Sequence, residues 1–217
     1  SLCFNSFLNH NIYVEGIQNI DKIDIDNANK LGYKIKLLGY AERIDGKIYQ
    51  RVHPTFIKKQ SYAASIDGVL NAVIIDGKPL GQSIIQGEGA GAAATTSALI
   101  SDISSILRGN IKFPFSISKK ERKNFEFNNI SKRLFSSYLR FEVLDKQGVL
   151  SHITKVFSKN NVSIKRLVQN PNKEKKTSTI IFITHKSKDE SLKKIIKEIC
   201  RKKYIRKKPK LIRIDDN

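Results

Sequence analysis

Short runs rich in β-branched and aromatic residues recur through the first half of the chain. Runs of this kind are typical of half-buried strands, and they predict strands at 11–17, 33–43, 47–53, 68–76 and 80–86. Between the first two strands, Asp21 or Asp24 is suited to cap a helix that ends near Leu31 and is closed by Gly32. The first half of the chain therefore predicts a mostly antiparallel sheet with helices on one face, which is an α+β layer.

Two dipeptides and one proline punctuate these strands. Asp45-Gly46 and Asp76-Gly77 are typical of tight hairpin turns, so they predict antiparallel neighbours on either side. Pro54 has no N–H to donate to a neighbouring strand, and we expect it to end the regular pairing of the third strand. Before the first strand, residues 1–10 are interpreted as the last turns of a helix.

A glycine-rich segment, GEGAGAAATTSALISDI, follows these strands and leads into a helix of small residues. Gly87, Gly89 and Gly91 allow positive φ and close approach of another group to the backbone. A helix that begins here would present free N–H groups to an anion. Apolar residues then return with helical spacing and predict a stripe that packs on a sheet: Leu99, Ile100, Ile103, Ile106 and Leu107. The alternative is a strand-to-helix corner that binds nothing.

The same segment satisfies the G-x-G-x-x-A form of the dinucleotide-binding fingerprint at Gly87, Gly89 and Ala92. That fingerprint requires a following parallel strand that ends in an acidic residue about 20 positions later. The chain instead continues with a basic stretch that is interrupted by Pro114. We therefore reject a dinucleotide-binding first turn at this point.

The hydrophobic pattern is lost after the glycine-rich segment and returns near residue 137. We interpret residues 111–136 as a linker between a first domain, 1–110, and a second, 137–217. The second domain predicts the order βαββαβ of a ferredoxin-like module. Its elements are expected at 138–145 (strand), 149–161 (helix), 162–169 and 177–185 (strands), 191–199 (helix) and 211–214 (strand).

Charge is unevenly distributed along the chain, which carries a formal net charge of +20. Residues 1–110 hold 11 basic and 10 acidic residues, and the remainder holds 29 basic and 10 acidic residues. A basic half is compatible with nucleic-acid binding. Because its basic residues are scattered through a patterned domain, we expect a solvated lysine surface and no nucleic-acid partner.

Composition disfavours several classes of protein. No apolar run reaches the roughly 20 residues of a membrane span, and Cys3 and Cys200 are too few and too far apart for a disulfide framework or a metal site. The chain contains no methionine, from which we interpret Ser1 as an internal cut point of a longer or processed chain. We expect a cytoplasmic protein with reduced thiols, no membrane partner and no bound metal.

The order of the motifs resembles that in bacterial homoserine dehydrogenase. YVEGI, ANKLGYKIKLLGYAE, VHPTFI, DGVLNAVIIDG and GEGAG followed by TTSALISDI are similar to its catalytic domain. DKQGVLSHITKVFSKNNVSI is similar to an ACT domain, the amino-acid-sensing module appended to that enzyme. The resemblance implies an NAD(P)-dependent oxidoreductase that interconverts L-homoserine and L-aspartate 4-semialdehyde in threonine and methionine biosynthesis. Since no second layer is evident on the other face of the first sheet, we expect a homodimer.

The resemblance also implies which parts of the active site this chain supplies. In the family, the nucleotide-binding domain and the catalytic lysine precede the matched region, so we assign no catalytic residue here and expect the chain alone not to turn over. The glycine backbone of GEGAG approaches the nicotinamide side of the cofactor, which assigns cofactor binding to Gly91 and Gly89. The chain departs from the family at Ala94, where proline is usual, and at 61–64, where SYAA replaces HPLA.

In ACT modules, the turn between the first strand and the first helix binds an amino acid between paired modules. The resemblance therefore assigns effector binding to Asp145, Gly148, Val149, Leu150, Asn161 and Ser163. Gly148 supplies the tight turn, the helix N-terminus can receive a carboxylate, and Asp145 can pair with an ammonium group. L-threonine, the pathway end product, is the effector that the family suggests. The alternatives are that Asp145 merely caps the helix and that the module binds nothing.

The remaining polar residues suggest no further chemistry. We interpret His53 as a structural histidine at a strand end, Glu88 as an exposed loop carboxylate and Asp102 as a solvated helix residue. Neither a Ser-His-Asp set nor a metal-ligand cluster is visible, and no role is assigned to His152 and His185. Two rival functions stay open: a stand-alone ACT-type regulatory protein that binds an amino acid without catalysis, and a basic nucleic-acid-binding protein.

Overall fold

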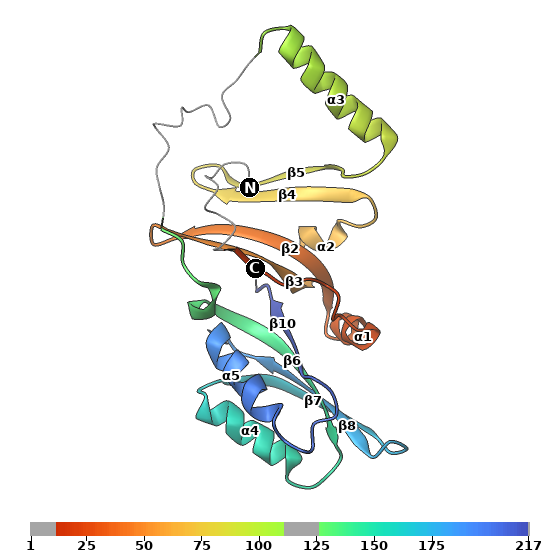
Figure 1. The fold of residues 1–217 in the computed structure, drawn as a ribbon, viewed down its shortest axis with the longest axis vertical. Helices are drawn as coiled ribbons and strands as arrows, with labels where there is room; N and C mark the ends of the chain where they lie inside the picture. Colours follow the sequence, from red (N-terminus) through yellow and green to blue (C-terminus); the bar gives the residue numbers. More distant parts are fainter. Residues whose placement is uncertain (1–11, 111–125, 217) are drawn as a thin grey trace. The chain divides into compact units, whose positions relative to one another are not determined.

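The structure, a computed structural model, describes residues 12–110 and 126–216. It divides into two compact units, which are described separately (Figure 1). The described residues of the larger unit are 12–58 and 126–216, and those of the smaller unit are 59–110. The helix expected at residues 1–10 lies outside the described residues.

The larger unit is built on an eight-stranded sheet. Its strand order is β1-β3-β10-β6-β8-β7, with β2 paired to β3 and β9 paired to β6. The β1–β3 and β10–β3 pairs are parallel, and the other pairs are antiparallel. The strands are β1 (Ile12–Val14), β2 (Tyr33–Ile44), β3 (Lys47–Lys58), β6 (Leu134–Leu144), β7 (Ile164–Asn172), β8 (Thr177–Thr184), β9 (Ser187–Lys188) and β10 (Lys210–Ile214).

The β2–β3 hairpin confirms the turn predicted at Asp45-Gly46. Asp45 has φ of 50° and Gly46 has φ of 76°, and two successive positive φ angles are those of the tight turn that suits the twist of a hairpin. The ladder extends from Ile44↔Lys47 to Tyr33↔Lys58. The turn thereby fixes the register of two long strands.

The expectation that Pro54 ends regular pairing is wrong, because β3 continues to Lys58 and Pro54 pairs with Leu37. The carbonyl oxygens of Val52 and Phe56 accept hydrogen bonds on the edge away from β2, from Glu15 and Asp215, each at 2.8 Å. Backbone groups alternate along a strand, so the nitrogen of Pro54 faces that same edge. It falls in the gap between β1, paired at residues 50–52, and β10, paired at 55–56. A missing N–H therefore interrupts neither ladder.

Helix α1 (Lys22–Lys30) confirms the helix predicted between the first two strands. Asp21 is its N-cap residue, and a carboxylate oxygen of Asp24 accepts a hydrogen bond from the Asp21 backbone nitrogen at 3.3 Å. Gly32 follows the helix with φ of 86°, as expected of a residue that closes a helix. Asp24 is fully buried, which the sequence pattern does not indicate.

The predicted βαββαβ module is present as β6, α4 (Val149–Lys159), β7, β8, α5 (Asp189–Ile199) and β10. The two helices cover one face of the sheet through an apolar core. Phe182 lies at its centre, stacked on Phe157 with ring centroids 4.7 Å apart and edge-on to Phe141 at 5.7 Å. Truncating such a buried phenylalanine to alanine typically costs about 3–5 kcal/mol.

The other face of the same strands is also buried, in a second cluster. Alternate residues of β6, β8 and β10 point to it, and Phe56 of β3 and Ala28 of α1 cover it. Its members are Ala28, Phe56, Tyr138, Ile181, Ile183, Ile212 and Ile214. Helix α1 and Phe56 of segment 12–58 therefore cover the second face of the module, while β1, β2 and β3 extend the same sheet.

The smaller unit contains α2 (Tyr62–Ser65), the hairpin of β4 (Leu70–Gly77) and β5 (Gly81–Glu88), and α3 (Ala92–Leu107). The hairpin is confirmed, but its turn comes later than predicted: the ladder reaches Gly77↔Gly81, so residues 78–80 make the turn. Helix α3 follows the glycine segment as predicted. Its apolar stripe, however, is exposed, with Ile103 at 55% and Leu107 at 82%. The stripe therefore packs on no sheet within the described residues, because the only strands of this unit form a two-stranded hairpin that is itself exposed.

The compact units differ from the expected division at residues 111–136. Segment 12–58, expected in the first domain, shares the large sheet with the βαββαβ module. Residues 111–125 of the expected linker lie outside the described residues. Its described end is structured: Phe127 forms a bridge with Ile48, and a short 3-10 helix, η4, spans Ile130–Lys132.

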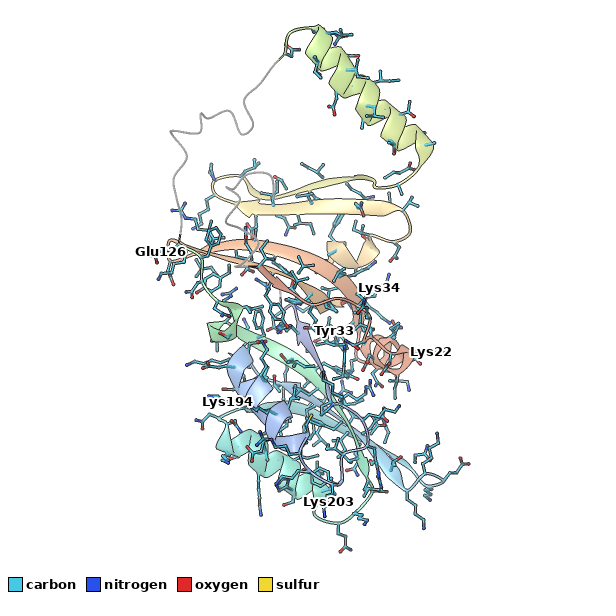
Figure 2. The ribbon with its side chains drawn as sticks, in the orientation of Figure 1. Lys22, Tyr33, Lys34, Glu126, Lys194 and Lys203 are labelled. Carbon is cyan, nitrogen blue, oxygen red and sulfur yellow. The ribbon has the colours of Figure 1, made fainter. Side chains whose placement is uncertain are left out.

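The basic residues of the second half lie largely on the surface. Lys194 on α5 and Lys203 in the turn that follows are exposed examples (Figure 2). This placement agrees with the expectation of a solvated lysine surface.

Candidate functional site

The glycine-rich segment joins β5 to α3 in the smaller unit. Gly91 is the N-cap residue of α3, and its carbonyl oxygen accepts from the Thr95 backbone nitrogen at 3.1 Å and from the Thr95 hydroxyl at 2.9 Å. The Gly89 nitrogen donates to the Val69 carbonyl oxygen at 2.8 Å. Both glycines are exposed, as is Glu88. The segment thus presents exposed backbone at the start of a helix.

A side chain would disturb Gly89 and Gly91 in different ways. A Cβ at Gly89 would lie 1.7 Å from the amide nitrogen of Asn71, so the exposed Asn71 side chain would have to move aside. Gly91 has φ of 121°, which L side chains rarely adopt, although a Cβ there would meet nothing within 4 Å. Open space beside Gly91 agrees with its assignment to cofactor binding. That assignment stays a prediction for both residues.

The predicted effector turn lies between β6 and α4. Gly148 is the N-cap residue of α4, with a left-handed φ of 82°. Asp145 is exposed and lies before the cap, so it does not cap the helix, and that alternative is wrong. Val149 and Leu150 are the first two residues of α4. Val149 lies in the core on the helix side of the sheet, and Leu150 packs against that core.

Asn161 and Ser163 lie at the other end of α4. The helix has 11 residues, which corresponds to about 16 Å at 1.5 Å per residue. Asn161 adopts a positive φ of 55°, and the Ser163 carbonyl oxygen accepts from the His185 nitrogen at 2.9 Å. One copy of the chain therefore does not bring Asp145 and Ser163 together. The six assigned effector residues stay a prediction that requires paired modules.

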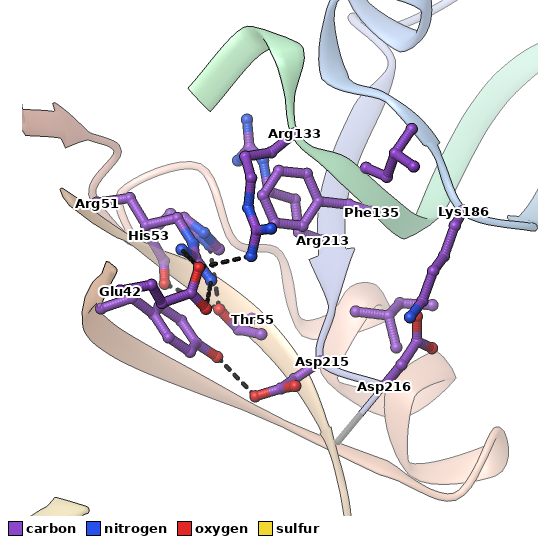
Figure 3. Close-up of a pocket in the computed structure, with 13 residues that line it drawn as sticks. Glu42, Arg51, His53, Thr55, Arg133, Phe135, Lys186, Arg213, Asp215 and Asp216 are labelled. Carbon is purple, nitrogen blue, oxygen red and sulfur yellow. Dashed lines mark hydrogen bonds and ion pairs between the residues drawn. The ribbon is translucent and has the colours of Figure 1, made fainter. Parts of the chain in front are cut away.

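A polar cavity of about 100 Å³ lies in the larger unit, where β3 meets β10 and the start of β6 (Figure 3). The sequence pattern did not predict this cavity. Residues from five separate segments line it: Tyr40, Glu42, Arg51, His53, Thr55, Arg133, Leu134, Phe135, Lys186, Arg213, Ile214, Asp215 and Asp216.

Two arginines share one carboxylate on this cavity. Arg51 pairs with Glu42 through two hydrogen bonds, at 2.9 and 3.1 Å, and Arg133 bonds to the same carboxylate at 2.5 Å. The two guanidinium groups lower the pKa of Glu42 although burial opposes them. The Arg51 guanidinium also lies 4.0 Å from the centre of the Tyr40 ring. The wall therefore carries more positive than negative charge.

Two carboxylates lie at the end of β10, on another wall. Asp215 accepts a hydrogen bond from the Tyr40 hydroxyl at 2.9 Å, and Asp216 accepts one from the Ser136 hydroxyl at 2.8 Å. The serine hydroxyl is neutral, so it leaves the negative charge of Asp216 in place. Burial raises the pKa of Tyr40 far above its ordinary range, and the negative charge of Asp215 adds to this effect.

His53 is a buried histidine on the cavity, only 1% exposed. Its Nδ1 lies 3.0 Å from the Pro54 carbonyl oxygen and 3.0 Å from the Thr55 hydroxyl. A carbonyl oxygen only accepts, so Nδ1 carries the proton of the neutral ring. Its Nε2 is then an acceptor, and it has no partner among the described residues. Burial lowers the pKa of His53 to about 4, so the ring is neutral at pH 7.

Two further buried ion pairs tie segment 12–58 and α5 to the sheet. Arg140 bonds to Asp24 at 2.7 and 3.0 Å, and Arg213 pairs with Asp189 at 2.7 and 2.8 Å. All four side chains are almost fully buried. Only pairs of this kind make buried charges tolerable. Because each of these two arginines has a buried carboxylate partner, no ligand is needed to explain why Arg140 and Arg213 are buried.

Two other kinds of feature are absent from the described parts of the chain. No group of three or more histidine, cysteine, aspartate or glutamate residues there is arranged to hold a metal ion. Nor does any helix there have the length and apolar character needed to cross a membrane. His152, to which no role was assigned, bonds through Nδ1 to the Tyr204 hydroxyl at 2.7 Å.

Two family models match the chain. The homoserine dehydrogenase model matches residues 2–104, and the ACT domain model matches residues 137–202. The order of the two matches agrees with the order of motifs in the sequence.

Curated relatives match nearly the whole chain. The homoserine dehydrogenase of Helicobacter pylori is 31% identical over 205 residues, which is 94% of this chain and 48% of the relative. That of Neisseria gonorrhoeae is 32% identical over 224 residues, which is 99% of this chain and 51% of the relative. The chain thus spans about half the length of the curated relatives it matches.

A solved structure supports the same grouping. The crystal structure of a homoserine dehydrogenase from Thiobacillus denitrificans superposes with a TM-score of 0.83 at 30% identity, covering 95% of this chain and 48% of that one. A homoserine dehydrogenase from S. aureus shares the fold, with a TM-score of 0.58 and 24% identity. The chain therefore carries a region that matches the homoserine dehydrogenase family model, followed by an ACT domain, and spans about half the length of the homoserine dehydrogenases it resembles.

Proposed function

We propose that the chain is part of an NAD(P)-dependent homoserine dehydrogenase that interconverts L-homoserine and L-aspartate 4-semialdehyde in threonine and methionine biosynthesis. The observation that carries the proposal is the collinear similarity to homoserine dehydrogenases over 94% or more of the chain. In this proposal the dinucleotide and the catalytic lysine are held by sequence that this chain does not contain. The chain contributes the glycine segment as one wall of the cofactor site.

The geometry of that segment supports the assignment. The reduced or oxidised dinucleotide supplies the hydride chemistry when bound. The residues of this chain would then exclude water and place the nicotinamide side against the backbone of Gly91 and Gly89. Exposed backbone at a helix start, with open space beside Gly91, fits a flat ring better than it fits a protein core.

The smaller unit has a large exposed apolar surface. In this proposal, a second copy of the chain or another domain of the enzyme covers it. Five side chains of the α3 stripe are each more than half exposed, and the hairpin strands expose Val73, Ile75 and Ile85 to a similar degree. Exposed apolar area of this extent usually marks a contact surface. In this proposal it is buried in the complete, cytoplasmic enzyme.

We propose that the ACT domain senses L-threonine at the turn containing Asp145 and Gly148. An α-carboxylate would bind the N-terminus of α4, and Asp145, exposed beside it, would hold the ammonium group. Asn161 and Ser163 would come from the second copy, because the two ends of α4 are about 16 Å apart.

The test combines an activity assay with a binding measurement. The 217-residue chain should not oxidise NADPH with aspartate semialdehyde, whereas the protein encoded by the complete reading frame should. Isothermal titration of L-threonine into the chain should show binding that Asp145→Ala abolishes. A complete protein that lacks the activity, with threonine binding retained, would favour the rival function of an ACT-type regulatory protein without catalysis.

A further inference from the structure

The polar cavity between β3, β10 and β6 is lined by polar and charged groups, some of which have no hydrogen-bond partner among the described residues. It belongs to a single compact unit and lies at the start of β6, whereas the Asp145 turn follows the end of that strand. An 11-residue strand spans about 33 Å at 3.3 Å per residue. The cavity is therefore separate from the predicted effector turn, and what it binds does not depend on the proposed function.

The buried polar atoms on the cavity are not all satisfied. His53 Nε2 and Arg51 Nε have no hydrogen-bond partner among the described residues, and these side chains are 1% and 5% exposed. Such atoms are rare in native structures because each costs about 1–3 kcal/mol. One is an acceptor and the other a donor, so a ligand that satisfies both must carry groups of both kinds.

The distribution of charge gives the same indication. On one wall, Arg51 and Arg133 share the single carboxylate of Glu42. On the opposite wall lies Asp216, with Lys186 beside it, and the Asp216 carboxylate accepts a hydrogen bond from a neutral serine hydroxyl. Positive and negative groups thus face one small space (Figure 3).

The size of the cavity limits what can enter. A single water needs about 10–15 Å³ by this kind of measure, so about 100 Å³ holds several waters or one small organic molecule. A nucleotide or a peptide is too large. We propose that the cavity is a binding site for a small amino acid in its zwitterionic form.

In the proposed complex, the carboxylate lies on the side of Arg51 and Arg133, and the ammonium group lies on the side of Asp216. The ligand would bridge β3, from segment 12–58, and β10, the last strand of the ACT module. It would therefore stabilise the junction between the two.

The test is a binding screen on the 217-residue chain. Each standard amino acid and L-homoserine is tested by thermal shift, and the best ligand is titrated calorimetrically beside propionate and ethylamine, which carry one charge each. We expect one small amino acid to bind while both single-charge compounds fail to bind at the same concentration. If propionate binds as tightly as the amino acid, the ammonium group contributes nothing, and the cavity is a simple anion site instead of a site for a zwitterion.

Variants identify the site. Arg133→Ala and Asp216→Asn each remove one charge from the cavity wall and should weaken binding about tenfold, the loss expected for one charge-assisted hydrogen bond. Lys194→Ala, an exposed lysine on α5, is the matched control and should bind normally. If no amino acid binds, or if binding is lost in Asp145→Ala and unaffected by both cavity variants, the proposal is wrong. The second result would leave the effector turn of the proposed function as the site.

Discussion

His53 shows how one buried side chain makes stability depend on pH. Burial lowers its pKa to about 4, helped by the charges of Arg213 and Arg51 and opposed by the Pro54 carbonyl and by Glu15. An unfolded histidine has a pKa of about 6.5. The unfolded chain therefore binds more protons between these values, so stability falls as the pH drops from about 6.5 to about 4.

The loss attributable to His53 should be on the order of 3 kcal/mol over that range. The measurement is urea unfolding of the wild type and of His53→Gln at pH 7 and pH 4.5. The glutamine variant lacks the titrating group, so its stability should change less between the two pH values. Identical pH dependence in both proteins would show that His53 is not held neutral.

The glycines of the cofactor segment allow a test at matched positions. In the complete enzyme, Gly91→Val should raise the KM for the dinucleotide at least about tenfold, because φ of 121° excludes a β-branched residue and the shifted backbone moves away from the cofactor. Gly87→Val is the control, since a Cβ there meets nothing within 4 Å and the residue lies in β5. An unchanged cofactor KM in Gly91→Val would remove Gly91 from the site.

At the scale of elements, α1 is held to the sheet by charge as well as by apolar contact. Asp24→Asn would leave the buried guanidinium of Arg140 without its closest buried carboxylate, although Asp21 and Glu142 remain at 2.7 and 2.6 Å. We expect a loss of about 3 kcal/mol in unfolding free energy, near the lower limit for breaking a buried pair. Asp26→Asn on the exposed side of the same helix should change stability by less than about 0.5 kcal/mol. Equal effects in chemical denaturation would contradict this.

Most elements could be predicted from the sequence because their signals are local. The Asp45-Gly46 turn, the cap at Asp21 and the helical stripe of α4 each depend on residues within a few positions of one another. The continuation of β3 past Pro54 could not, because it depends on β1 and β10 leaving a gap opposite that residue. Local chemistry alone cannot show which neighbours a strand will have.

The polar cavity was missed for the same reason. Its residues come from β2 and β3, from the start of β6, from Lys186 and from the end of β10. Arg51 and Arg213 read as ordinary strand residues of a basic chain. Only the pairing of β3 with β10 brings them to one space. The one usable signal was the Arg-x-His pattern of Arg51 and His53, since alternate positions place both side chains on one face of β3.

At the scale of the whole larger unit, the ACT module depends on segment 12–58. In β8, Ile180 and Phe182 face the helices, while Ile181 and Ile183 face the second cluster beneath Phe56. The continuous apolar run TIIFIT is typical of a strand that is buried on both faces. Its second face needs a cover, which α1 and β3 provide.

A chain of residues 126–217 should therefore be less stable than the full chain. Removing segment 12–58 exposes five large side chains of the second cluster, from Tyr138 to Ile214, and each buried isoleucine contributes about 1.5–3 kcal/mol. The sum is comparable to the whole stability of a small domain. We expect a lower urea midpoint and concentration-dependent self-association.

A double variant, Ile181→Thr with Ile212→Thr, provides the control. It should reduce self-association of the short chain yet destabilise the full chain, where both sites are buried. A short chain as stable and as monomeric as the full one would show that the two segments fold independently.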